Sequence, residues 1–180
     1  MDKQSALMII GLIADGVLLA QVFLIFLAVI LILDNVTKKN ESIKKIVRIF
    51  SDNALIFSFF LALFATAGSL FLSEIAHFVP CKLCWYQRIA MYPQVLLLGI
   101  ASLKSDFLVR KYILPLSVIG LVIAIYHYAL QMSPIPLPCS DELANCALKQ
   151  INYFGYITIP LMSATAFALI ILFMLLLRKK

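Results

Sequence analysis

Five long apolar runs constrain this chain more than any other feature of its sequence. They are Leu7–Leu33, Ala54–Val79, Trp85–Leu103, Tyr112–Met132 and Tyr156–Leu177. Each run is near or above the ~20 residues that a helix needs to cross a bilayer. Only helices and closed barrels satisfy their backbone groups in lipid, and none of the runs alternates with the period of two of a barrel strand. We therefore expect an all-α integral membrane protein with five spanning helices.

The composition excludes the other classes of chain. Hydrophobic residues make up 63% and charged residues 13% of the 180 positions, against roughly 45–50% and ~25% in soluble domains. A soluble fold of this size could not cover so much apolar surface with so few polar groups. Disorder is excluded as well, because disordered chains are poor in hydrophobic residues.

The basic residues predict the orientation, because cytoplasmic loops carry an excess of Lys and Arg. If segment 34–52 is cytoplasmic, 11 of the 15 Lys and Arg residues lie on that side. They are Lys38, Lys39, Lys44, Lys45, Arg48, Lys104, Arg110, Lys111, Arg178, Lys179 and Lys180. Asp2 and Lys3 cancel before the first run, so this run is a retained helix rather than a cleaved signal peptide. We expect a multi-pass protein of the cell membrane with its N-terminus outside and its C-terminus in the cytoplasm. The same bias accounts for the net charge of +6 without a nucleic acid partner.

All four cysteines then fall on the outer, oxidising side, where disulfides persist. Cys81 and Cys84 form a C-x-x-C pair before the third run, and Cys139 and Cys146 lie in the loop before the fifth. Three interpretations compete for them: two structural disulfides, a zinc site of four thiolates, and a redox relay between the pairs. The two-residue spacing favours the relay, because it is common in oxidoreductases, where it lowers a thiol pKa.

The neighbours of the first pair strengthen the redox interpretation. We expect the third helix to begin at or just after Cys84, so that the helix dipole favours a thiolate there. Arg88 follows one turn later on the same face. Its guanidinium would also favour the thiolate and could bind a polar ligand at the membrane edge. The alternative is an arginine that merely snorkels to the interface.

A second polar patch lies near the outer end of the fourth run. His127 and Gln131 are four residues apart and therefore share a helix face. A histidine at the membrane boundary could hydrogen-bond a carbonyl or move a proton. The alternative is a histidine whose hydrogen bonds serve packing alone.

Four segments carry a resemblance to a known family. They are residues 71–75 (FLSEI), 80–93 (PCKLCWYQRIAMYP), 126–128 (YHY) and 154–160 (FGYITIP). The chain resembles the disulfide bond formation protein B (DsbB) family, most closely its shorter, BdbC-type branch. The resemblance covers roughly residues 55–180 and includes all four cysteines in family order.

The resemblance implies a four-helix membrane bundle that reoxidises an extracytoplasmic thioredoxin-like thiol oxidase of the DsbA or BdbD type. Electrons would pass through two cysteine pairs to a membrane quinone, either ubiquinone or menaquinone. By position, Cys139 would form the mixed disulfide with the partner and Cys146 would be its pair. Cys81 would exchange electrons with that pair, while Cys84 would face the quinone.

The resemblance also implies the residues that bind the quinone. Arg88 would bind and polarise it, His127 would lie near its ring, and we assign Gln131 to the same group because it shares the face of His127. The four cysteines are thus the expected catalytic residues, no metal is expected, and the resemblance implies a protein-disulfide-forming quinone reductase.

The chain departs from the family pattern in two places. Residues 1–53 add a helix and a basic cytoplasmic loop to the family-like domain of residues 54–180. All the expected catalytic residues follow position 80, so we expect this helix to be an accessory with no part in electron transfer. Gln87 stands where many members carry an acidic residue before the arginine, although glutamine is usual in the BdbC-type branch.

Overall fold

The computed structural model describes residues 3–37, 41–133 and 145–177. Its helices are α1 (Lys3–Thr37), α2 (Glu41–Asp52), α3 (Ala54–Leu70), α4 (Lys82–Lys104), α5 (Arg110–Met132) and α6 (Ile159–Leu176). A π-helical turn, η1 (Phe71–Ile75), extends α3, and a 3-10 turn, η2 (Phe107–Val109), leads into α5. Within the described ranges there is no β-strand, so the prediction of an all-α membrane protein is confirmed.

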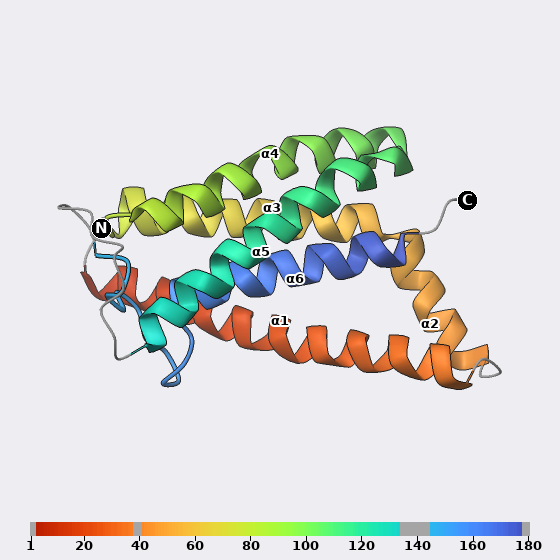
Figure 1. Ribbon diagram of the computed structural model, residues 1–180, viewed down its shortest axis with the longest axis horizontal. Coiled ribbons are helices and arrows are strands. Elements are labelled where there is room, and N and C mark those ends of the chain that lie inside the picture. The colour runs from red at the N-terminus through yellow and green to blue at the C-terminus, as the bar shows by residue number, and fades with distance from the viewer. Residues whose placement is uncertain (1–2, 38–40, 134–144, 178–180) are drawn as a thin grey trace.

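Helices α3, α4, α5 and α6 form a closed bundle in which each packs against the next and α6 returns to α3. Helix α1 lies outside this bundle, against α6, and the short helix α2 leads from the far end of α1 back to α3 (Figure 1). The four-helix bundle with one extra N-terminal helix is thus the architecture expected from the sequence.

Four stretches of the described chain are long and apolar enough to cross a membrane: Gln4–Asp34, Ala54–Ile75, Phe107–Met132 and Ile159–Leu176. The fifth predicted span, α4, is a helix of 23 residues, about 35 Å long at 1.5 Å per residue. Polar residues lower the hydropathy of α4, and the bundle buries two of them, Gln87 and Gln94. Gln94 accepts a hydrogen bond from Ser117 of α5 at 2.9 Å, which joins the two helices in the bundle core.

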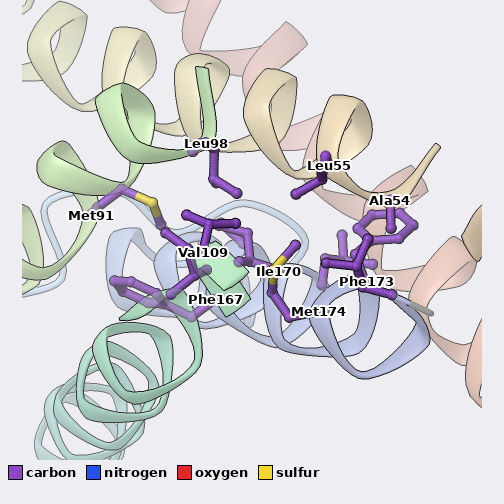
Figure 2. Close-up of a cluster of buried hydrophobic side chains, with 14 of the residues drawn as sticks. Ala54, Leu55, Met91, Leu98, Val109, Phe167, Ile170, Phe173 and Met174 are labelled. Carbon is purple, nitrogen blue, oxygen red and sulfur yellow. The ribbon is translucent and has the colours of Figure 1, made fainter. Parts of the chain in front are cut away.

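The apolar core lies between α6 and the helices around it. Phe167, Ile170 and Met174 of α6 are fully buried and point toward Leu98 of α4 and Leu55 of α3 (Figure 2). Helices α5 and α6 approach closely at Gly120, where a Cβ atom would overlap the ring of Phe167. The core therefore holds α4, whose first turn carries the cysteine pair, in a fixed relation to α3, α5 and α6.

Candidate functional site

The C-x-x-C pair lies at the start of α4. The helix begins at Lys82, with Cys81 as its N-cap in an extended conformation, and the first helical hydrogen bond runs from Trp85 N–H to the Cys81 carbonyl at 3.1 Å. The predicted start at or just after Cys84 was therefore two to three residues too late, because a cysteine is not one of the residues that usually mark an N-cap. Both sulfurs consequently belong to the first turn, where the helix dipole favours a thiolate.

Cys81 and Cys84 are both free thiols with their sulfur atoms 3.3 Å apart, close enough to share a hydrogen bond. Cys81 is buried, whereas Cys84 is partly exposed. The pKa of Cys81, which precedes the helix, is lowered from 9.0 to about 4. The main cause is the side-chain hydrogen bond with Cys84; His127 adds to it, and burial opposes it. This shift favours Cys81 over Cys84 as the thiolate of the reduced pair.

His127 connects this pair with the second cysteine loop. It comes from α5, is 2% exposed, and places Nε2 3.7 Å from the Cys81 sulfur and 3.1 Å from the carbonyl oxygen of Cys146. Gln87 of α4 holds the other side of the ring, because its side-chain nitrogen donates to Nδ1 at 3.1 Å. The ring proton is thus on Nε2, where it can be donated to the Cys81 thiolate or to the Cys146 carbonyl.

The other face of the pair borders a cavity of about 790 Å³ between α1, α3, α4 and α6. Cys84 lines this cavity together with Arg88, Gln87, Ser69 and Tyr92, while Cys81 is not among its lining residues. Most of the remaining lining is apolar. The two sulfurs of one pair therefore have different surroundings: Cys81 contacts His127, which also contacts the Cys146 carbonyl, and Cys84 faces the cavity.

Arg88 is fixed at the polar end of the cavity. Its Nε donates to the Ser69 hydroxyl and its Nη2 to the Ser69 carbonyl, both at 3.0 Å. The guanidinium carbon also lies 5.3 Å from the ring centroid of Trp85, a cation–π distance. A guanidinium has five N–H groups, so these contacts within the described chain leave others for a ligand in the cavity.

The structure places the remaining predicted residues elsewhere. Gln131 donates to the carbonyl of Leu148 at 3.2 Å, and neither Gln131 nor His127 is among the lining residues of the cavity. Cys146 is buried and disulfide-bonded. Cys139 lies outside the described residues. The predicted constellation is therefore divided, with Arg88 and Cys84 at the cavity and His127 between the two cysteine pairs.

The side chains of Cys81, Cys84 and His127 could also hold a metal ion. Their ligand atoms all lie within 4.8 Å of one another. The zinc site of four thiolates considered from the sequence would need Cys146 as a thiolate, whereas Cys146 is disulfide-bonded. What the described residues offer is three ligands of the Cys₂His type, which resembles the protein ligand set of some zinc sites with an open position.

Sequence reasoning missed two parts of the site. Gln87 stood out only as a departure from the family pattern, and its contact with His127 depends on how α4 and α5 pack. The sequence of α1 has no feature that predicts a place at the cavity, yet five residues of this helix line the cavity wall.

Comparison with known proteins identifies the family. The model of the family described as "Disulfide bond formation protein DsbB" matches residues 51–177. "Disulfide bond formation protein C" of Bacillus subtilis (strain 168) is 51% identical over 124 residues, which cover 67% of this chain and 89% of the relative. The "Probable disulfide formation protein" of Oceanobacillus iheyensis is 42% identical over 135 residues, covering 72% and 92%. That of Coxiella burnetii (strain CbuK_Q154) is 42% identical over 122 residues, covering 66% and 83%.

No solved structure matches the chain significantly. The family match and these relatives confirm the resemblance that the sequence motifs indicated, including its BdbC-type branch. The chain belongs to the DsbB family of disulfide bond formation proteins, and it is a multi-pass membrane oxidoreductase of that family.

Proposed function

We propose that this protein reoxidises an extracytoplasmic thioredoxin-like thiol oxidase and delivers the electrons to a membrane quinone. The observation that carries this proposal is the division within the C-x-x-C pair. Cys81 is buried against His127, whose Nε2 also lies 3.1 Å from the Cys146 carbonyl, whereas Cys84 lines the cavity with Arg88. The C-x-x-C pair thus adjoins His127 and, through it, Cys146 on one side and the cavity between the helices on the other.

The proposed sequence begins with thiol–disulfide exchange, in which a thiolate attacks one sulfur of a disulfide and displaces the other as a thiolate. A partner thiolate attacks Cys139, which releases Cys146 as a thiolate. Cys146 then attacks Cys81 of the oxidised C-x-x-C pair, which releases Cys84. The second partner thiolate completes the partner's disulfide and frees Cys139. Cys139 then attacks Cys146, which breaks the Cys81–Cys146 bond, releases Cys81 as a thiolate and restores the Cys139–Cys146 disulfide. Two electrons have then moved from the partner to Cys81 and Cys84.

His127 serves this exchange in two ways. Its Nε2–H stabilises the Cys81 thiolate when that sulfur is the leaving group, and it holds the backbone of Cys146 beside the pair. Gln87 keeps the ring in the tautomer that can donate from Nε2. In this proposal His127 and Gln87 are positioning residues between the two pairs rather than contacts of the quinone ring.

The cavity residues fit a lipid-soluble quinone. The cavity's volume of about 790 Å³ lies in the ~300–1,000 Å³ range of sites that enclose a small molecule. Arg88 offers charge-assisted N–H donors to a carbonyl oxygen, and Cys84 lines the same cavity. When bound, a quinone supplies an acceptor for two electrons and two protons. The residues at this end bind and orient the acceptor beside Cys84, and the apolar lining excludes water.

The proposal includes an orientation. We place the four cysteines outside the cytoplasm and the C-terminus inside, in agreement with the excess of basic residues in the other segments. A membrane-impermeant thiol reagent should therefore label the cysteines of intact cells after reduction. Labelling that requires broken membranes would contradict both the orientation and the choice of an extracytoplasmic partner.

Reconstitution tests the proposed reaction. The protein is placed in liposomes with a quinone, and a reduced thioredoxin-like thiol oxidase is added outside. We expect two partner thiols to be lost for each quinone reduced, and we expect Cys84→Ser to abolish the reaction. A protein that binds stoichiometric zinc through Cys81, Cys84 and His127 and reduces no quinone would instead support a metal site. Inert cysteines without zinc would indicate structural disulfides.

A further inference from the structure

One wall of the cavity comes from α1, the helix that the family pattern lacks. Its lining residues are Ile9, Ile13, Gly16, Val17 and Ala20. They follow one another at helical spacings of three, four and one, so they form a single stripe along one face. The stripe runs over 12 residues from Ile9 to Ala20, a length of about 16 Å at 1.5 Å per residue. The apolar wall formed by α1 is therefore much longer than a single aromatic ring.

Small residues keep this part of the cavity open. A Cβ atom added at Gly16 would meet no atom within 4 Å, and the same holds at Gly68 on the facing helix α3. Both glycines line the cavity, and Ala20 and Ala65 line it as well. The space between α1 and α3 is thus not filled by the protein's own side chains.

The cavity is polar at one end and apolar along α1. Six of the polar lining residues lie on α3, η1 and α4, around Arg88, Ser69 and Cys84, and all five lining residues of α1 are apolar. The other polar lining residues are Gln150 and, on α6, Ser163 and Thr165. A ligand that fits the whole cavity has a polar ring at the end near Arg88 and a hydrocarbon chain along the wall formed by α1. A water-soluble ligand would leave the α1 wall without a partner.

Gln21 makes two hydrogen bonds that fix the extra helix against the rest of the protein. Gln21 donates to the Thr165 hydroxyl of α6 at 3.3 Å, and its carbonyl oxygen accepts a hydrogen bond from Tyr156 at 3.0 Å. Gln21 directly follows Ala20, the last lining residue of the stripe. These bonds hold the cavity-lining face of α1 in register with α6.

We propose that α1 forms a tail compartment for the isoprenoid chain of the quinone, with Gly16 as the residue that keeps this compartment open. The inference rests on the proposed function, since it assigns the tail of the same acceptor whose ring lies toward Cys84 and Arg88. It gives the N-terminal helix a role in selecting tailed over tail-less quinones. Electron transfer itself stays with the cysteine pairs.

The test is a binding measurement with the full-length protein in nanodiscs. Trp85 is the only tryptophan and lies at the polar end beside Arg88, so quenching of its fluorescence reports quinone in the cavity. The probes are a naphthoquinone without a tail and the same ring with a tetraprenyl tail. Gly16→Phe fills the tail compartment, Gly16→Ala adds only a methyl group, and Leu19→Phe places the same ring on a 69% exposed position of α1 outside the lining.

We expect Gly16→Phe to raise the Kd of the tailed quinone at least about tenfold, because it displaces several tail carbons from an apolar site. The tail-less quinone should bind all variants equally, which also shows that the fold is intact. Leu19→Phe should bind the tailed quinone like the wild type, and Gly16→Ala, which adds one methyl group, should raise its Kd by less than Gly16→Phe does.

Two results would overturn the inference. Unchanged binding of the tailed quinone to Gly16→Phe would mean that the tail does not occupy the space beside α1. Equal weakening of both quinones would mean that the substitution acts on the ring site rather than on a tail compartment. Turnover of the tail-less quinone by the wild type tests the proposed function separately. If the wild type neither binds nor reduces either quinone, both proposals fail.

Discussion

Replacing His127 with alanine should raise the pKa of Cys81. Nε2 of His127 lies 3.7 Å from the Cys81 sulfur and 3.1 Å from the Cys146 carbonyl oxygen, so its one proton is shared between them. We therefore take the lower end of the range of free energies for hydrogen bonds to charged acceptors as the stabilisation of the Cys81 thiolate by His127. That lower end is about 1.5 kcal/mol, and about 1.4 kcal/mol corresponds to a tenfold change in an acid constant. Because loss of a donor disfavours the thiolate, the pKa should rise from about 4 to about 5.

The thiolate's ultraviolet absorbance measures this pKa directly. The titration uses reduced protein in which Cys139 and Cys146 are replaced by serine, so that only the C-x-x-C pair contributes. The absorbance should develop between about pH 3 and 5 in this background and about one pH unit higher after His127→Ala. Tyr126→Phe is the matched control, because Tyr126 is the neighbouring residue of α5 but is half exposed.

Two results would refute the reasoning. An unchanged midpoint in His127→Ala would show that the imidazole does not stabilise the thiolate. A midpoint near that of an ordinary thiol, about 8.5, in the protein that retains His127 would show that Cys81 is not the thiolate of the pair at all.

Three further predictions concern the stability of the bundle, the cavity and the Cys139–Cys146 pair. Gly120→Ala should destabilise the bundle by about 1–3 kcal/mol because its Cβ overlaps Phe167, and it should lower the Tm, whereas Gly68→Ala, which meets open space, should not; equal Tm values would contradict the close α5–α6 approach. Arg88→Ala should raise the apparent KM for quinone and lower kcat, with Arg88→Lys intermediate because the planar fork is lost; unchanged quinone kinetics would reduce this arginine to an interfacial anchor. Cys139→Ser should abolish oxidation of the partner while sparing quinone-driven reoxidation of the C-x-x-C pair, and simultaneous loss of both half-reactions would show that the pairs are not separate stations.

The sequence predicted the helices well because a bilayer imposes a simple rule. Each span needs about 20 apolar residues, and each predicted run corresponds to a helix of the structure. The site was predictable where chemistry is local, as at Cys84 and Arg88, which lie one turn apart on α4 and both line the cavity. The start of α4 was misplaced because Cys81 caps the helix without a side-chain hydrogen bond.

The parts that sequence reasoning missed depend on contacts between helices. His127 was assigned to the quinone site, but its observed contacts are with Gln87, Cys81 and the Cys146 carbonyl. Nothing in the spacing along one helix reveals which neighbour its polar face will meet. The place of α1 was equally hidden, because lipid and the bundle surface are both apolar and an apolar helix does not indicate which of its faces meets protein.

The central claim is that Cys81 faces the Cys139–Cys146 pair, whereas Cys84 faces the quinone. Trapping the disulfide between the two pairs tests it most directly. In Cys84→Ser, the Cys81 thiolate can attack Cys146 of the Cys139–Cys146 disulfide and release Cys139 as a thiolate. A Cys81–Cys146 disulfide should therefore accumulate, identified by mass spectrometry of the digested protein, because no Cys84 is present to displace Cys146 from Cys81. Cys81→Ser should accumulate no disulfide between the pairs. A Cys84–Cys146 disulfide in Cys81→Ser, with none in Cys84→Ser, would reverse the roles of the two sulfurs and contradict the account.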